Sequence, residues 1–210
     1  MSLSPKQYDK LKQALEWRLL GAKMYRALDA FHLASRYMQN GKRKNGEPSL
    51  IHEVSIAHFA LTLKGVEDML EDLLCVIFCH DLMEDYNVTE EELRQIVTPE
   101  AFAAIWSMTK TYDGVKFDDR TVFFNISRNL LAALAKGLDR INNYQSMTGT
   151  FTNQKQLSYM AEGYEHFMPM LKAARKNFVK YTDAFLNIET MLRYQLQLLE
   201  VINNQPGQSV

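Results

Sequence analysis

The sequence has few cysteines and no long apolar run. Its two cysteines, Cys75 and Cys79, lie four residues apart in one apolar stretch, where small cysteines usually serve as packing residues; neither a disulfide nor a zinc site is expected. No apolar stretch approaches the roughly 20 residues needed to cross a bilayer. The polar segment 2–10 does not resemble a signal peptide. We therefore expect a cytoplasmic protein with no membrane partner.

Neither sign of charge dominates the sequence. Lys and Arg number 24 and Asp and Glu 25, which gives a formal net charge of −1 and argues against bulk electrostatic binding of nucleic acid. An anionic ligand must instead meet a local basic patch. The densest positive charge is Lys42, Arg43 and Lys44, inside the segment 40–48, whose glycines, asparagines and proline predict a loop.

Apolar residues recur at helical spacing along almost the whole chain, and no segment shows strand periodicity. The pattern predicts an all-α fold, with residues 1–210 forming one domain, a bundle of about eight helices. We expect its core at about 22–177, a C-terminal helix at about 182–203 and a frayed tail from 205. The predicted helices include 50–63, 119–147 and 154–177, and residues 111–118 are expected to form a loop.

The segment 73–85 is the most informative part of the chain. It is an apolar run that ends in His80, Asp81, Glu84 and Asp85. Burying such polar side chains without partners costs roughly several kcal/mol. A bound metal ion would offset that cost. On a helix, His80 lies over Glu84, and Asp81 over Asp85. The alternative is a core helix whose polar end caps itself at the surface.

Two further apolar helices are also expected to end in polar side chains. His52 lies in the first turn after the basic loop, and Asp139 follows the leucine stripe of 130–138. Two imidazoles and two carboxylates suit a divalent ion such as Mn, Fe, Zn or Co. Four ligands around a six-coordinate ion leave two positions open, as in catalytic sites. Glu84 is then placed to orient a water or relay its proton.

These motifs, taken together, resemble the HD superfamily of phosphohydrolases, and most closely the hydrolase domain of RelA/SpoT homologues and small alarmone hydrolases. The similarity spans about 27–174. The Arg-x-x-Gly-Glu-Pro-x-x-x-His motif is matched by Arg43, Gly46, Glu47, Pro48 and His52, and His-Asp-x-x-Glu-Asp by His80, Asp81, Glu84 and Asp85. Later family motifs are matched by Thr109, Lys110, Asp139, Arg140, Asn143, Glu162, Glu165, Phe167, Pro169 and Met170.

The resemblance implies a mechanism and a substrate. His52, His80, Asp81 and Asp139 would hold one ion, typically manganese, and Glu84 and Asp85 would activate water. A guanine nucleotide would meet Arg43 and Lys44, with Asn143 near its ribose. The implied reaction removes pyrophosphate from the 3′ position of guanosine tetra- or pentaphosphate. The family's synthetase domain has no counterpart before Val210, which predicts a stand-alone hydrolase.

The chain departs from the family pattern at three places. Residues 37–41 read Tyr-Met-Gln-Asn-Gly instead of Ala-His-x-Gly-Gln, Glu53 replaces a common proline, and Tyr86 replaces a threonine. Two alternatives therefore stay open: an HD phosphohydrolase for another nucleotide, and a nucleotide-binding regulator without turnover. The sequence does not determine the native metal or the oligomeric state.

Overall fold

The structure, a computed structural model, describes residues 4–204 and confirms the all-α prediction. Within that range the chain forms twelve α-helices, more than the expected eight or so, with one short hairpin. Their bounds are α1 Pro5–Gly21, α2 Tyr25–Tyr37, α3 Ile51–Ala60, α4 Leu70–Cys79, α5 Leu82–Asp85, α6 Glu90–Ile96, α7 Pro99–Met108, β1 Thr111–Tyr112, β2 Val115–Lys116, α8 Asp119–Ser127, α9 Leu130–Met147, α10 Asn153–Glu162, α11 Met168–Asn177 and α12 Thr182–Asn203.

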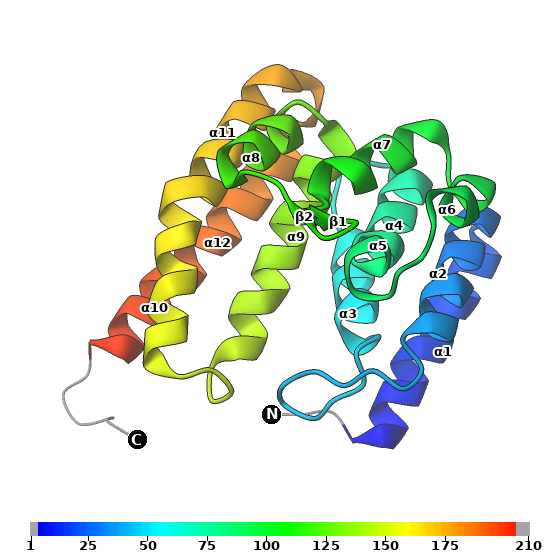
Figure 1. Cartoon of the computed structure of the whole chain (residues 1–210), viewed down its shortest axis with the longest axis horizontal. Helices are drawn as coiled ribbons and strands as arrows, with labels where there is room; N and C mark the ends of the chain where they lie inside the picture. Colours follow the sequence, from blue (N-terminus) through cyan, green and yellow to red (C-terminus); the bar gives the residue numbers. More distant parts are fainter. Residues whose placement is uncertain (1–3, 205–210) are drawn as a thin grey trace.

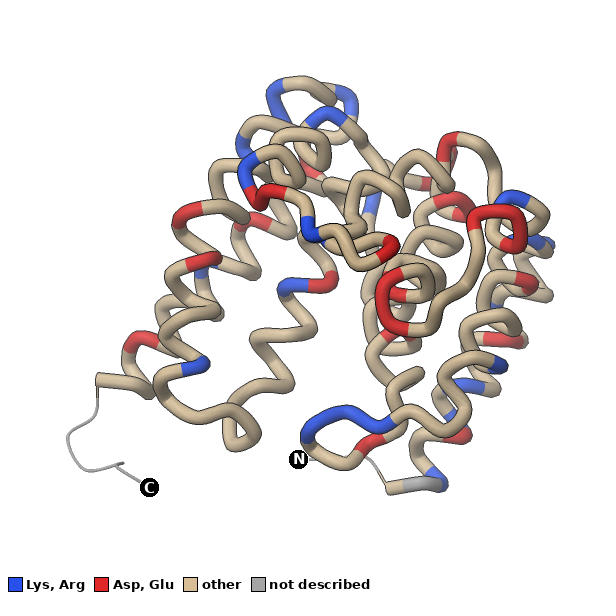
Figure 2. Tube along the Cα trace, viewed as in Figure 1, with Lys and Arg blue, Asp and Glu red and all other residues tan. Residues whose placement is uncertain are grey.

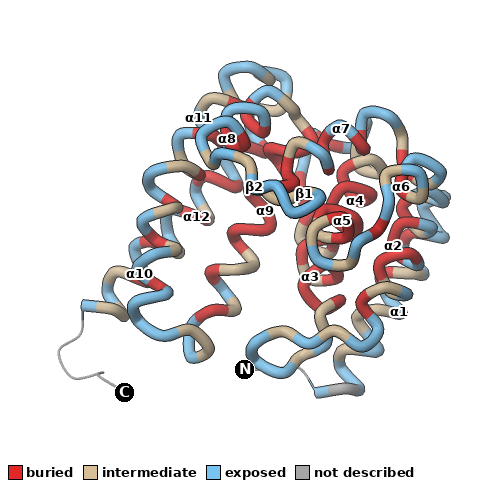
Figure 3. Tube along the Cα trace, viewed as in Figure 1, coloured by how far each residue is buried: buried red, intermediate tan, exposed pale blue. Residues whose placement is uncertain are grey.

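The helices form two groups with α9 between them (Figure 1). Helices α1 to α7 gather around α4, which packs against α2, α3, α7 and α9. Helices α8 and α10 to α12 form the second group, in which α12 and α11 pack on α9. Figure 3 shows that buried residues run along α3, α4 and much of α9.

The last seven residues of α4, 73–79, are wholly apolar and are buried on every side of the helix. Cys75 and Cys79 lie here as buried free thiols. Burial raises the pKa of Cys75 to about 12, so its thiol stays protonated and packs like a small apolar side chain.

Two predicted helices are interrupted. The prediction of a continuous helix over 119–147 was wrong. Asn129 takes an extended conformation, and its side chain accepts a hydrogen bond from Ala132 N, so that it caps a new helix, α9. The segment 73–85 is also divided: α4 ends at Cys79, His80 and Asp81 form a turn, and α5 follows. The predicted helix 154–177 runs on through a π-turn at Gly163–Phe167, and α12 agrees with its predicted bounds.

The expectation of an irregular loop at 111–118 was also wrong. Strands β1 and β2 pair there in an antiparallel hairpin, with Thr111 opposite Lys116 and Tyr112 opposite Val115. Asp113 and Gly114 connect them with φ of 49° and 76°, as an Asp-Gly two-residue turn requires. The sequence signal was the Asp-Gly pair.

The predicted frayed tail from 205 lies outside the described residues. Across 4–204, no helix combines the length and the apolar character needed to cross a bilayer.

The contact of α9 with α11 and α12 depends on a small residue. A Cβ atom at Gly137 would lie 2.6 Å from Ile188 Cγ2 and 3.1 Å from Leu171 Cδ2. We expect Gly137→Ala to lower the free energy of unfolding by about 1–3 kcal/mol, the usual cost of overpacking, as measured by urea denaturation.

Gly21→Ala is the matched control, because no heavy atom lies within 4 Å of the added Cβ and alanine favours a helix. We expect it to be neutral or stabilising. Equal stability of the two variants would contradict the close packing inferred at Gly137.

Candidate metal centre and nucleotide cleft

The four predicted metal ligands come from three sequence-distant regions that meet where α3, α4 and α9 pack together. His52 lies in the first turn of α3, His80 and Asp81 form the turn after α4, and Asp139 lies in the middle of α9. His52, His80 and Asp139 are buried, and Asp81 is partly exposed. The predicted residues therefore lie close together, although the first and the last, His52 and Asp139, are more than 80 positions apart in the sequence.

The His52 ring has a defined orientation. Its Nδ1 lies 2.7 Å from Asn142 Oδ1, and because an amide oxygen only accepts, Nδ1 carries the hydrogen. The other nitrogen, Nε2, lies 3.1 Å from Asp139 Oδ1. In a neutral ring, Nε2 thus presents a lone pair to a carboxylate oxygen.

The His80 ring repeats this arrangement. Its Nδ1 lies 2.8 Å from the carbonyl oxygen of Ile77, so Nδ1 again carries the hydrogen. Its Nε2 is buried, has no hydrogen-bond partner among the described residues, and lies 3.2 Å from Asp81 Oδ1. Two lone pairs facing two carboxylates require a positive charge between them, either protons or a metal ion.

The carboxylates around the two rings raise the pKa of both imidazoles. Although burial acts to lower it, Asp81, Glu53 and Asp139 raise the pKa of His80 to about 9. The pKa of His52 is raised as well, with Glu53 and Asp139 outweighing burial. In the absence of a metal ion, protons would therefore supply part of the missing positive charge.

Asp139 is held by two neighbours on α9, one at each carboxylate oxygen. Lys136 Nζ donates to Asp139 Oδ2 at 2.9 Å, and Asn143 Nδ2 donates to Oδ1 at 2.6 Å. Burial acts to raise its pKa, but Lys136, His52 and His80 hold it well below the usual value. Asp139 is therefore an anchored anion, and Asn143, predicted near the ribose, is also one of its hydrogen-bond partners.

Glu53 is a member of this group that the sequence analysis did not place there. Its side chain is 1% exposed, and its Oε2 lies 3.4 Å from His80 Nδ1 without a hydrogen bond. Burial raises the pKa of Glu53 to about 7. The sequence signal was that Glu53 sits among Ile51, Val54 and Ile56, in a helix too apolar to have a solvent face.

One ion fits the geometry of this group. His52, Glu53, His80 and Asp81 each offer a ligand atom, and these atoms all lie within 4.8 Å of one another. Ligands on opposite sides of an ion are about two bond lengths of 2.0–2.4 Å apart. This buried group of two imidazoles and carboxylates could bind a divalent metal ion.

A cleft of about 370 Å³ opens over the group, between the two sets of helices. Its lining includes the predicted residues His52, Asp81, Asp85, Asn143, Arg43 and Lys44. Figure 2 shows the basic positions of the loop between α2 and α3, and acidic positions around α5. The lining of the cleft therefore combines basic residues of the loop with the acidic residues Asp81 and Asp85.

The basic loop closes as a tight turn. Arg43 N donates to Glu47 O at 2.8 Å, and Gly46 has a φ of +83°, which favours glycine. An Arg43 guanidinium nitrogen then donates across the cleft to Asn143 Oδ1 at 3.4 Å and Ser146 Oγ at 3.2 Å. The predicted binding residues Arg43 and Asn143 are therefore in contact.

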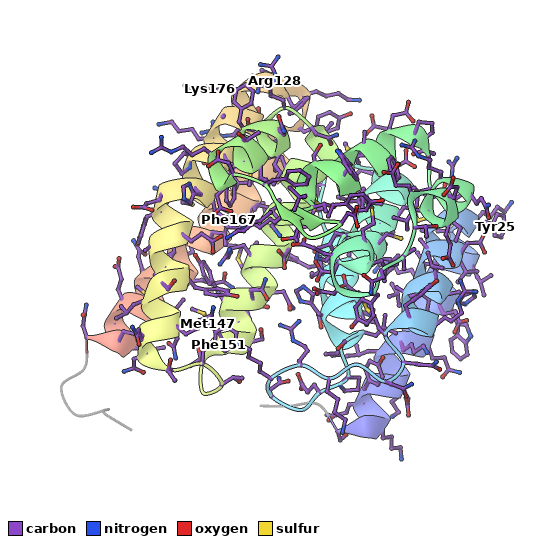
Figure 4. The ribbon with its side chains drawn as sticks, viewed as in Figure 1. Tyr25, Arg128, Met147, Phe151, Phe167 and Lys176 are labelled. Atoms are coloured by element: carbon purple, nitrogen blue, oxygen red, sulfur yellow. The ribbon has the colours of Figure 1, made fainter. Side chains whose placement is uncertain are left out.

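Lys44 reaches the far wall of the cleft, where its Nζ lies 4.9 Å above the Phe151 ring. Figure 4 shows Phe151 at the turn between α9 and α10. Phe151 and Tyr159 both line the cleft and supply aromatic surface that the sequence motifs did not indicate.

The predicted catalytic carboxylates have different positions. Asp85 lines the cleft, and burial, with Asp81 and Glu84 nearby, raises its pKa. Glu84 Oε2 instead accepts a hydrogen bond from the backbone N of Lys110 at 3.3 Å. Of the two, Asp85 has the more direct access to the cleft.

Arg140 forms a buried charge network beside the site. One guanidinium nitrogen donates to Glu162 Oε2 at 2.6 Å, and Lys110 Nζ donates to Glu162 Oε1 at 3.1 Å. The Arg140 guanidinium also lies 3.9 Å from the centre of the Phe167 ring, which Figure 4 places between α9 and the outer helices. This network joins α9, the α7–β1 connection and α10.

We expect Glu162→Gln to lower the free energy of unfolding at pH 7 by about 3 kcal/mol, because it leaves the buried Arg140 charge uncompensated. Burial acts to raise the pKa of Glu162, but Arg140 and Lys110 hold it below its usual value. The carboxylate therefore stabilises the fold above its unfolded-state pKa, and that contribution is lost as the pH falls through the lowered pKa. Denaturant titrations at several pH values would measure this.

Glu165→Gln, at an exposed neighbouring glutamate, is the control and should change stability little. A constant difference between wild type and Glu162→Gln down to acidic pH would contradict the role given to the ion pair.

Comparison with known proteins finds distant relatives of the chain. It is 24% identical over 149 residues to a probable guanosine-3′,5′-bis(diphosphate) 3′-pyrophosphohydrolase of Synechocystis, covering 67% of this chain and 19% of that protein. It is 23% identical over 191 residues to the GTP pyrophosphokinase rsh of Brucella melitensis, covering 85% of this chain and 25% of that protein. No family model matches the sequence. The chain spans about a fifth to a quarter of the length of these relatives and is similar to RelA/SpoT-type enzymes.

Proposed function

We propose that the chain is a metal-dependent HD-type phosphohydrolase that removes pyrophosphate from the 3′ position of guanosine tetra- or pentaphosphate. The observation that carries the proposal is the pair of oriented imidazoles, whose Nε2 atoms face Asp139 and Asp81 at the base of the cleft. The names of the relatives support the substrate, since one is a 3′-pyrophosphohydrolase of the same guanosine bis(diphosphate).

His52, His80, Asp81 and Asp139 would hold the ion, for which manganese is our first choice. A bound divalent ion would lower the pKa of a water molecule and neutralise charge on the phosphate. The hydrogen bonds to Asn142 and Ile77 fix the two rings with Nε2 toward the site. Lys136 and Asn143 hold Asp139 in place, so the ligand set would be arranged before the ion binds.

The cleft offers suitable partners for the remaining parts of the nucleotide. Arg43 and Lys44 bring positive charge to the rim, where phosphate groups would lie. Phe151 and Tyr159 provide flat apolar surface on which a base could stack. Asp85, which lines the same cleft, is placed to accept a proton from the attacking water.

We expect the protein loaded with Mn²⁺ to convert guanosine tetraphosphate to GDP and pyrophosphate in equal amounts, and the chelator-treated protein to be inactive. His52→Ala and Asp139→Ala should each lose the metal, as measured by elemental analysis, together with turnover. His58→Ala is the matched control, because His58 lies on the same helix as His52 but its Nε2 contacts Leu11 O at 3.2 Å, and it neither lines the cleft nor belongs to the metal group.

The outcomes distinguish the alternatives. Cleavage of another nucleotide, but not of guanosine tetraphosphate, would leave the metal chemistry in place and change the substrate. Tight binding of guanosine tetraphosphate without cleavage would instead identify a nucleotide-binding regulator. Unchanged metal content in both ligand variants would show that the ligands are wrongly assigned.

Asp85→Asn keeps the size of the side chain and removes the base. We expect turnover to fall by about two to four orders of magnitude, the usual contribution of general acid–base help, while the metal content and the Kd for the nucleotide stay near wild type. Glu84→Gln should have a smaller effect, because Glu84 is engaged by Lys110 N. A larger loss in Glu84→Gln than in Asp85→Asn would reverse the assignment of the base.

A further inference from the structure

We propose that Glu53 is an additional protein ligand of the metal centre, one that distinguishes this chain from family members with proline at that position. The inference rests on the metal-dependent function proposed above. It concerns a residue that neither the family motif nor the names of the relatives assign to the site.

The Glu53 carboxylate is buried and only partly compensated. Glu53 is 1% exposed, and its Oε2 has no hydrogen-bond partner among the described residues. Its ion-pair neighbour is His80, whose Nδ1 lies 3.4 Å from Glu53 Oε2 but is engaged by the carbonyl oxygen of Ile77 at 2.8 Å. A carboxylate in such a place is costly unless it is paired or coordinates a metal.

Glu53 also lies close to the proposed metal ligands. Glu53 follows His52 in the first turn of α3, and its carboxylate lies within 4.8 Å of ligand atoms on His52, His80 and Asp81. Glu53 also lines the cleft that opens over these residues. One ion at the centre of the group would therefore be within reach of all four side chains.

The added carboxylate has a chemical consequence. A third acidic oxygen donor makes the ligand set harder and more negative than two histidines with two aspartates. Oxygen-rich, higher-coordinate sites suit Mn²⁺, whereas Zn²⁺ prefers four ligands in a tetrahedron. Glu53 should thus strengthen binding of Mn²⁺ more than binding of Zn²⁺.

The test is calorimetric titration of metal-free protein with MnCl₂ and, separately, ZnCl₂. We expect Glu53→Gln to weaken Mn²⁺ binding by about 10- to 100-fold and Zn²⁺ binding by less. Thermal unfolding supplies a second readout: without metal, Glu53→Gln should melt at or above the wild-type Tm, because a buried carboxylate has been removed. The Tm increase on adding Mn²⁺ should be smaller than for wild type.

Glu189→Gln is the matched control. Glu189 is also buried, but it is paired with Arg175 Nε at 2.7 Å and is remote from the metal group in sequence. Its replacement should lower the Tm with and without metal and leave both affinities unchanged. Wild-type Mn²⁺ affinity in Glu53→Gln would overturn the assignment of Glu53 alone, whereas failure of the wild-type protein to bind any metal would overturn the proposed function itself.

Discussion

Two imidazole nitrogens face two carboxylate oxygens inside the protein, and this arrangement depends on most of the surrounding structure. The Nδ1 atoms of His52 and His80 are committed to Asn142 Oδ1 and Ile77 O, which leaves Nε2 of each ring toward Asp139 and Asp81. Such a group is stable only with positive charge at its centre. The divalent cation proposed above would supply that charge directly below the cleft.

The fold supplies the geometry by burying two helices almost completely. Helix α4 ends where its apolar sequence ends, so His80 and Asp81 emerge in a turn and not on a continuous helix. Helix α9 passes between the two helix groups and brings Asp139, Lys136 and Asn143 to the same place. The residues that hold the ligands are therefore as much a part of the site as the ligands themselves.

The sequence was sufficient for the fold class and for the proximity of His52, His80, Asp81 and Asp139, because apolar helical stripes that turn polar mark where buried helices reach a site. It was not sufficient for orientation. The break at Asn129 and the turn at His80 depend on local capping and on packing between distant helices, and periodicity does not report either. Glu53 was noted only as a replacement of a common proline, and its burial became visible when the packing of α3 placed it inside the protein.

The most direct measurement is the anomalous scattering of a crystal grown with Mn²⁺. The account predicts a single strong peak within coordination distance of the Nε2 atoms of both His52 and His80, with Asp81 and Asp139 among the neighbouring oxygens. The additional contribution of Glu53 would be visible in the same map. Absence of a peak in this group, or a fully bound ion at another site with both histidines unligated, would contradict the central claim.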